Sequence, residues 1–243
     1  MKQPRDRASA PETGELASAG AAEDPAAGPG PQHLAATAFI DSDHPVVRTF
    51  TARAVGDATG PQRVARLFAG VRDQIRYDPY SVTRDPRDYV ASSVIERGAS
   101  YCVPKAVVLT AAARALCIPA RVGFSDVRNH LQTPRLAEAM GTDVFVFHGY
   151  AELYLDGAWR KATPAFNASL CARFGVDPLQ FDGTEDAMLH AFTGDGSRHM
   201  EYVAQRGVYA DLPLALILST FAASYPGLIG CERPIDAFSA VER

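Results

Sequence analysis

A cysteine followed two positions later by proline, and then by a long apolar run, places the strongest constraint on what this chain can fold into. The run extends from Pro104 to Leu116 and is rich in alanine, which favours helix. Because it is apolar on most faces, we expect a central helix that is buried nearly all round. Proline is tolerated only in the first turn of a helix, so this helix should begin at Cys102 or Val103 and end before Pro119.

A strand and a β-hairpin are expected after this helix. Apolar and polar residues alternate over 120–125, and two strand-like segments, 143–155 and 158–163, flank Asp156-Gly157. Asp-Gly is a typical two-residue hairpin turn. A central helix that packs on an antiparallel sheet is an α+β fold, and the sequence predicts this class.

The turn also predicts a register for the hairpin. Glu152 should face Lys161, an opposite-charge pair that supports this alignment. Continued along the strands, the register places Tyr150 opposite Thr163 and His148 opposite Ala165. Thr163 and Asn167 would then be the diagonal neighbours of His148 on its own face of the sheet.

The chain divides by composition into a tail and a folded part. Residues 1–33 are rich in Ala, Pro, Gly and Glu, and we expect a disordered N-terminal tail. Residues 34–243 should form a single domain, with its core at about 89–167 and a helical or loop extension at 168–243. The most apolar run of the extension, 212–225, is too short to cross a membrane and predicts a buried helix.

The composition excludes several classes of protein. Four cysteines in 243 residues do not make a disulfide scaffold, and a net charge of −4 lacks the basic excess of a generic nucleic-acid binder. No apolar secretory signal follows the N-terminal basic residues. We therefore expect a cytoplasmic protein with free thiols and with neither a nucleic-acid nor a membrane partner.

Cys102 differs from the other cysteines in its position. A helix N-terminus carries unpaired N–H groups and partial positive charge, which stabilise a thiolate, so Cys102 is expected to react at a lower pH than an ordinary thiol. Cys117 lies at the opposite end of the helix, and neither Cys171 nor Cys231 has a recognisable basic partner. Most free cysteines are merely small buried apolar residues, so a nucleophile needs a second indication.

His148 supplies that second indication. On the predicted strand it shares a face with Tyr150 and Glu152, whereas the opposite face is uniformly apolar and should meet the core. His148 can therefore line a pocket. Arg121 and Arg128 lie near the edge of the strand that follows the helix and are expected to be solvated.

Two blocks of sequence in this order resemble the transglutaminase-like superfamily of papain-like cysteine acyl-transfer enzymes. They are GASYCVPKAVVLTAAARALCIPARVGF and FHGYAELYLDGAWRKATPAFN. The resemblance implies that Cys102 is the nucleophile and His148 the general base. Where the family usually has aspartate before proline, this chain has Thr163. Asn167 could replace it, since a Cys-His-Asn arrangement also works in papain-like enzymes. Asp126 and Asp143 are more remote candidates.

The implied reaction is acyl transfer through a thioester, of the peptidase, amidase or transamidase type. A biosynthetic acyl cyclase or condensing enzyme with the same Cys-His pair, and an inactive transglutaminase-like binding module, are alternatives. The expected partner is a peptide-like or small-molecule acyl substrate. His190 and His199 have no metal-type spacing, and we expect neither a metal nor a cofactor. The sequence leaves open whether water, an amine or a carbanion accepts the acyl group, and leaves the oligomeric state open.

Overall fold

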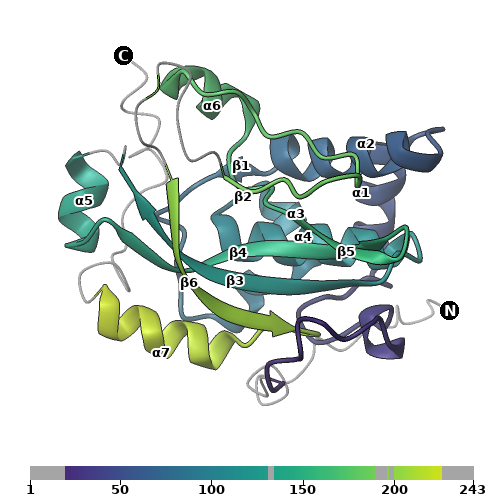
Figure 1. Cartoon of the computed structure of the whole chain (residues 1–243), viewed down its shortest axis with the longest axis horizontal. Coiled ribbons are helices and arrows are strands. Elements are labelled where there is room, and N and C mark those ends of the chain that lie inside the picture. The colour runs from purple at the N-terminus through teal and green to yellow at the C-terminus, as the bar shows by residue number, and fades with distance from the viewer. Residues whose placement is uncertain (1–19, 131–133, 190–195, 197–199, 226–243) are drawn as a thin grey trace, which may run out of the picture.

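The computed structural model describes residues 20–130, 134–189, 196 and 200–225. Its centre is a four-stranded antiparallel sheet in the order β5-β4-β3-β6, with helix α4 packed against one face (Figure 1). The predicted α+β fold, with a central buried helix on an antiparallel sheet, is confirmed.

The elements follow one another along the chain with mostly short connections. The strands are β1 Arg76–Tyr77, β2 Ala99–Ser100, β3 Ala120–Asn129, β4 Val144–Leu155, β5 Ala158–Ala162 and β6 Met200–Tyr209. The α-helices are α1 Pro45–Val55, α2 Gly60–Gln74, α3 Ala91–Arg97, α4 Cys102–Ala115, α5 Pro134–Met140, α6 Ala168–Phe174 and α7 Leu214–Ser224. The 3-10 helices within the described residues are η2 Pro31–His33 and η3 Pro86–Tyr89.

Helix α4 is enclosed by other elements on every side. Every residue from Cys102 to Arg114 is buried. One side of the helix contacts β3 and β4, and the remaining sides contact α1, α2 and α3. Pro104 lies in the first turn, where its missing N–H has no intrahelical partner to lose. The apolar run thus forms the helix that its sequence predicts.

The two cations on this helix are buried because carbonyl groups surround their ends. Lys105 donates to Arg72 O at 2.9 Å and to Ile75 O, so it satisfies carbonyls at the end of α2. Burial lowers the pKa of Lys105 to about 7. Arg114 donates through Nε and Nη2 to Ala120 O at the start of β3. Lys105 lies at the C-terminal end of α2, where the partial negative charge of the helix dipole further stabilises its ammonium group.

The hairpin register is confirmed near the turn. Leu155 pairs with Ala158, and Glu152 pairs with Lys161. The ladder stops at the pair Ala151–Ala162, so the expected pairs at Thr163 and Ala165 do not form.

Strand β5 stops pairing with β4 after Ala162 because a segment at Ala187 hydrogen-bonds with its backbone instead. Ala162 forms a parallel bridge with Ala187, and Thr163 N donates to Ala187 O at 2.9 Å. Pro164 follows at once. The edge of β4 is therefore open from Tyr150 towards Val144.

A β-bulge interrupts β4 beside this open edge. Between the pairs Ser125–His148 and Val127–Phe145, β3 advances two residues and β4 advances three. Phe147 takes the left-handed conformation, with φ of 53°. The bulge ends the strict alternation of faces that the sequence predicts for this strand.

Residues 20–33 are packed against the sheet, so the predicted disorder is wrong for this part of the tail. Glu23 N donates to Val208 O of β6, and Trp159 Nε1 donates to Ala27 O at 2.8 Å. Arg121 Nη2 donates to Pro25 O at 2.7 Å. These contacts use backbone carbonyls, which composition does not reveal. Residues 1–19 lie outside the described part of the chain.

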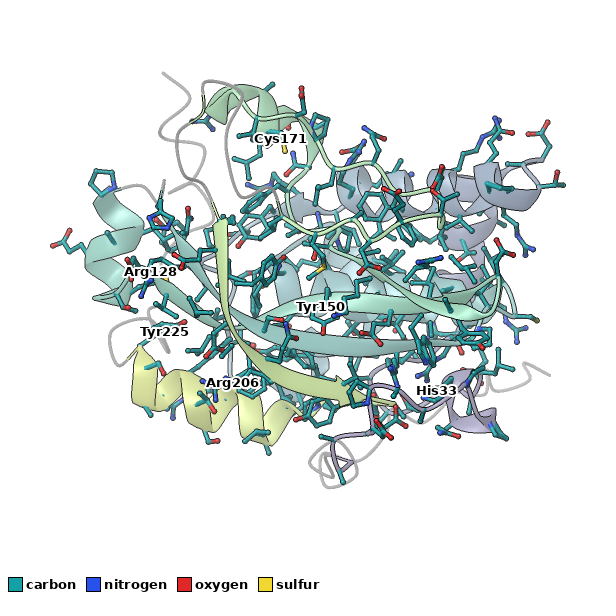
Figure 2. All side chains as sticks on the ribbon, in the orientation of Figure 1. His33, Arg128, Tyr150, Cys171, Arg206 and Tyr225 are labelled. Carbon is teal, nitrogen blue, oxygen red and sulfur yellow. The ribbon has the colours of Figure 1, made fainter. Side chains whose placement is uncertain are left out.

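Arg121 is buried and not solvated as expected. Its Nε lies 2.7 Å from Glu152 Oε2, and its guanidinium stacks on Trp159 at 4.1 Å from the ring centre. Arg128, labelled in Figure 2, is partly exposed and pairs with Asp143 at 3.2 Å. The Arg121–Glu152 pair forms because the residues face each other across β3 and β4 and are covered by residues 20–33.

The predicted helix at 212–225 is present as α7, but it is not fully buried. Leu214, Ile217 and Phe221 face the core, whereas Leu216 is 45% exposed. Within the part of the chain that the structure describes, no helix is long and apolar enough to cross a membrane. The division of the chain into a tail and a single domain with an extension stays a prediction.

Gly149 in β4 permits the close approach of α4 to the sheet, and its replacement tests that packing. A Cβ at this position would lie 2.8 Å from Val103 Cα, which is backbone and cannot move aside cheaply. We expect Gly149→Ala to lower the free energy of unfolding by about 1–3 kcal/mol, as overpacking does. Thermal melts should show a fall in Tm of roughly 2–10 °C.

The matched control is Gly28→Ala. A Cβ at Gly28 meets nothing within 4 Å, and this glycine does not have a left-handed φ. Its melt should stay within about 2 °C of the parent chain. Equal shifts for the two variants would contradict the proposed close packing.

Candidate active site

The short strands β1 and β2 pair in parallel, and β2 ends two residues before the start of α4. Tyr77 pairs with Ser100, Tyr101 is the N-cap in extended conformation, and Cys102 is the first helical residue. The helix therefore begins where the sequence predicts. Cys102 is only 6% exposed.

The environment of the Cys102 thiol has two opposing effects on its ionisation. Burial raises the pKa of the thiol to about 11, although backbone N–H groups of Gly149, Val103 and Cys102 itself act in the lowering direction. The expected low pKa is therefore not what the structure gives. Desolvation of an anion outweighs the helix terminus here, because the thiol is enclosed by apolar and aromatic side chains.

His148 directly precedes the residue that touches the cysteine. Gly149 lies against Cys102 O and Val103, so β4 crosses the first turn of α4 immediately after His148. The His148 side chain is 4% exposed, and burial lowers its pKa to about 4. Its Nε2 is buried with no hydrogen-bond partner among the described residues. A buried donor or acceptor without a partner is costly and needs an explanation.

The bulge next to His148 is held by a buried carboxylate. Asp126 Oδ1 accepts a hydrogen bond from Phe147 N at 3.1 Å. Arg206 of β6 binds the same carboxylate through Nε and Nη2, with Nη2 at 2.6 Å from Oδ2. Its guanidinium also lies over the Phe147 ring. Asp126 thus supports the backbone beside His148, and Asp143 pairs with Arg128 away from the site.

Thr163, at the position where the family usually has aspartate, is 1% exposed. Its hydroxyl lies 3.7 Å from Met188 Sδ and shares a hydrogen bond with the Tyr202 hydroxyl. Tyr202 in turn accepts from Leu189 N at 3.1 Å and interacts electrostatically with Cys102. Burial raises the pKa of Tyr202 to about 12, so the Thr163–Tyr202 pair is neutral at ordinary pH.

The Asn167 side chain is engaged at both ends. Oδ1 accepts from Tyr77 N at 3.2 Å, and Nδ2 donates to Ser169 Oγ at 2.6 Å. Asn167 stands at the N-cap position of α6 and ties this helix to β1. These bonds support Tyr77 and leave the amide committed to partners other than His148.

Three tyrosines near Cys102 were not identified from the sequence. Tyr77, Tyr101 and Tyr225 each interact electrostatically with the thiol. Tyr225 follows α7 and reaches the backbone of β4 (Figure 2). Neither it nor Tyr202 carries a local motif, because both come from the last third of the chain and reach the site only through the fold. Of the three, Tyr101 alone could have been noticed in the sequence, because it directly precedes Cys102.

The other cysteines lie elsewhere. Cys117 is exposed just after α4 and has φ of 60°, a conformation that suits the glycine usual in the family. Cys171 is buried in α6, and burial raises its pKa. Cys231 lies outside the described residues.

Comparison with solved structures gives distant matches, of which three are described. A candidate cysteine protease from Cytophaga hutchinsonii has 14% identity and a TM-score of 0.43, and the match covers 70% of this chain and 62% of that one. A candidate protease from Parabacteroides distasonis has 14% identity and a TM-score of 0.33, covering 48% of this chain and 22% of that one. A TGase has 23% identity and a TM-score of 0.34, covering 52% and 32%. The chain thus spans less than two thirds of each of these structures.

The family comparison is more specific. No curated protein matches the chain. The model of the transglutaminase-like superfamily matches residues 47–164, from α1 through the hairpin to the proline after Thr163. The match contains Cys102, His148 and Thr163 in the order expected from the sequence. Residues 47–164 of this chain therefore belong to the transglutaminase-like superfamily.

Proposed function

We propose that this protein is a cysteine acyl-transfer enzyme that works through a thioester on Cys102. The observation that carries the proposal is the contact between the first turn of α4 and β4, which sets Cys102 against the residue that follows His148. A nucleophile and a base must be neighbours for a proton to pass between them. The family assignment of residues 47–164 supports the same chemistry.

The first half-reaction transfers the acyl group to sulfur. Cys102 Sγ attacks the carbonyl carbon of the donor, and its proton passes to the free Nε2 of His148. The backbone N–H groups at the start of α4 stabilise the oxyanion of the tetrahedral intermediate. When that intermediate collapses, the bond to the leaving group breaks and His148 returns the proton to the leaving group.

The second half-reaction releases the acyl group. Water or an amine attacks the thioester carbon and gives a proton to His148, the C–S bond breaks, and the sulfur recovers the proton. Water makes the enzyme a peptidase or amidase, and an amine makes it a transamidase. This mechanism requires no cofactor, and a peptide-like or small-molecule acyl donor suits it.

We assign Thr163 the role of positioning His148, in preference to Asn167. The Asn167 amide is committed to Tyr77 and Ser169, whereas Thr163 occupies the position of the family's aspartate and is braced by Tyr202. A hydroxyl orients an imidazole without stabilising its positive charge. The resting pair of Cys102 and His148 is therefore neutral, and the proton moves only as the carbonyl is attacked.

An inactive binding module is the competing function, and the absence of the family's aspartate favours it. Incubation of the full chain with activated acyl esters, followed by intact and peptide mass spectrometry, separates the two functions. We expect an acyl adduct on Cys102 that is absent from Cys102→Ala. An adduct that persists in Cys102→Ala, or no adduct with any donor, would overturn the enzyme assignment.

The raised pKa of the buried thiol predicts an unusual pH profile for alkylation. Because the thiolate becomes abundant only near pH 11, labelling of Cys102 by iodoacetamide should keep rising about tenfold per pH unit from pH 7 to 10. Peptide-resolved mass spectrometry measures this rate, with exposed Cys117 in the same sample as the internal comparison. A plateau reached below pH 7 would indicate a preformed thiolate–imidazolium pair and would refute the neutral resting state.

The positioning role of Thr163 is tested by removing its hydroxyl alone. Thr163→Val keeps the shape, and we expect kcat/KM for acyl transfer to fall roughly three- to tenfold, the value of one hydrogen bond. Thr163→Ser is the matched control and should retain most activity. Alkylation of Cys102 without donor should be unchanged in both. If the valine variant matches the parent chain across the pH profile, Thr163 has no role in orienting the base.

A further inference from the structure

Cys102 forms one wall of a pocket beside the start of α4. The other walls come from β1 with the loop that follows it, from α5, from β4 next to its bulge, and from α7 with the residue that follows it. The residues that matter for its chemistry are Leu136, Met140, Phe145, Val146, Phe221 and Tyr225. Segments that are far apart in the sequence thus converge on Cys102.

The surface of this pocket is apolar although tyrosines line it. Among the described residues that line it, no side chain is charged. The Tyr225 hydroxyl donates to Val144 O at 2.8 Å and accepts from Val146 N, so it completes the hydrogen bonds of β4 at the bulge. The Tyr101 hydroxyl donates to the Tyr89 hydroxyl at 3.3 Å. These two hydroxyls are occupied away from the pocket.

The pocket is also small. Its free volume is about 30 Å³, and a water molecule needs roughly 10–15 Å³ on the same measure. Such a volume suits a short chain, and Met140 and Phe221 are among the side chains that limit it. A carboxamide head would lose its hydrogen bonds to water here without replacing them.

We infer that this pocket receives the acyl chain of the donor, and that the donor is a short aliphatic acyl ester, thioester or amide of about two to four carbons. The inference rests on the proposed function, because it names the substrate class of the same nucleophile. The reaction is the one given above: the short acyl chain forms a C–S bond with Cys102, and the leaving group departs with the thiol proton. The leaving group lies outside the pocket.

A chain-length series on the full protein tests this inference. The donors are the p-nitrophenyl esters of acetate, butyrate, hexanoate and octanoate. The polar counterpart is the p-nitrophenyl ester of a four-carbon acid whose far end carries a carboxamide. The rate of p-nitrophenol release is corrected with Cys102→Ala. We expect butyrate to exceed both octanoate and the carboxamide ester at least tenfold in kcat/KM. Each buried methylene should contribute about fourfold until the pocket is full.

A variant that enlarges the pocket sharpens the test. Met140→Ala should move the optimum to hexanoate or octanoate. Phe221→Leu removes less volume and should move the chain-length optimum in the same direction. This second variant keeps the test valid if Met140→Ala does not fold. The matched control is Leu216→Ala, on the exposed side of α7, which should keep the parent profile.

The outcomes separate this inference from the proposed function. If mass spectrometry finds acylated Cys102 but the carboxamide ester or octanoate is preferred, or both enlarged variants keep the parent optimum, the pocket assignment is wrong and the acyl-transfer function stands. If no ester acylates Cys102, the proposed function fails and the pocket assignment fails with it.

Discussion

The contact between the first turn of α4 and the backbone of β4 is the constraint on which the rest of the structure depends. It requires glycine at position 149, because a Cβ there would clash with Val103. It also requires that the edge of β4 be free, since β5 would otherwise occupy the same side. Both conditions place the Cys102 sulfur beside the backbone N–H of Gly149, the residue that follows His148. The backbone contact at Gly149 therefore brings Cys102 to within one residue of His148 along β4, and the proposed pairing of nucleophile and base rests on this contact.

The open edge of β4 is maintained by interactions from distant parts of the chain. Ala187 draws the chain away from β4 after Ala162, and the Tyr225 hydroxyl satisfies the freed backbone groups on either side of Phe145. Asp126 satisfies the N–H of Phe147 in the bulge. An open edge normally invites another strand, and a bulge with internal hydrogen bonds prevents that pairing. The interactions that stop β-pairing thus leave Phe145 and Val146 free to line the pocket beside Cys102.

Local chemistry explains which parts of the fold the sequence could predict. Pro104 fixed the start of α4, and Asp156-Gly157 fixed the hairpin register, because both depend on neighbours in the chain. The position of Thr163 outside the hairpin ladder could not be predicted. Its backbone N–H is bound by Ala187, which lies more than twenty residues further along the chain. The packing of residues 20–33 was missed for a related reason: Arg121 binds their carbonyl oxygens, and any sequence presents carbonyls.

The site residues divide in the same way. Cys102 and His148 can be proposed from the sequence because each belongs to a local pattern, whereas Tyr202 and Tyr225 come near Cys102 only through the fold. These aromatic groups help to bury the Cys102 thiol, for which the sequence alone predicts ready ionisation. A helix N-terminus alone favours a thiolate, but an apolar enclosure raises the cost of any charge, and burial moves the pKa values of Cys102 and His148 away from the ion pair. A neutral Thr163–Tyr202 pair suits such a site better than a buried aspartate, because it adds no charge that a neutral imidazole would leave unbalanced.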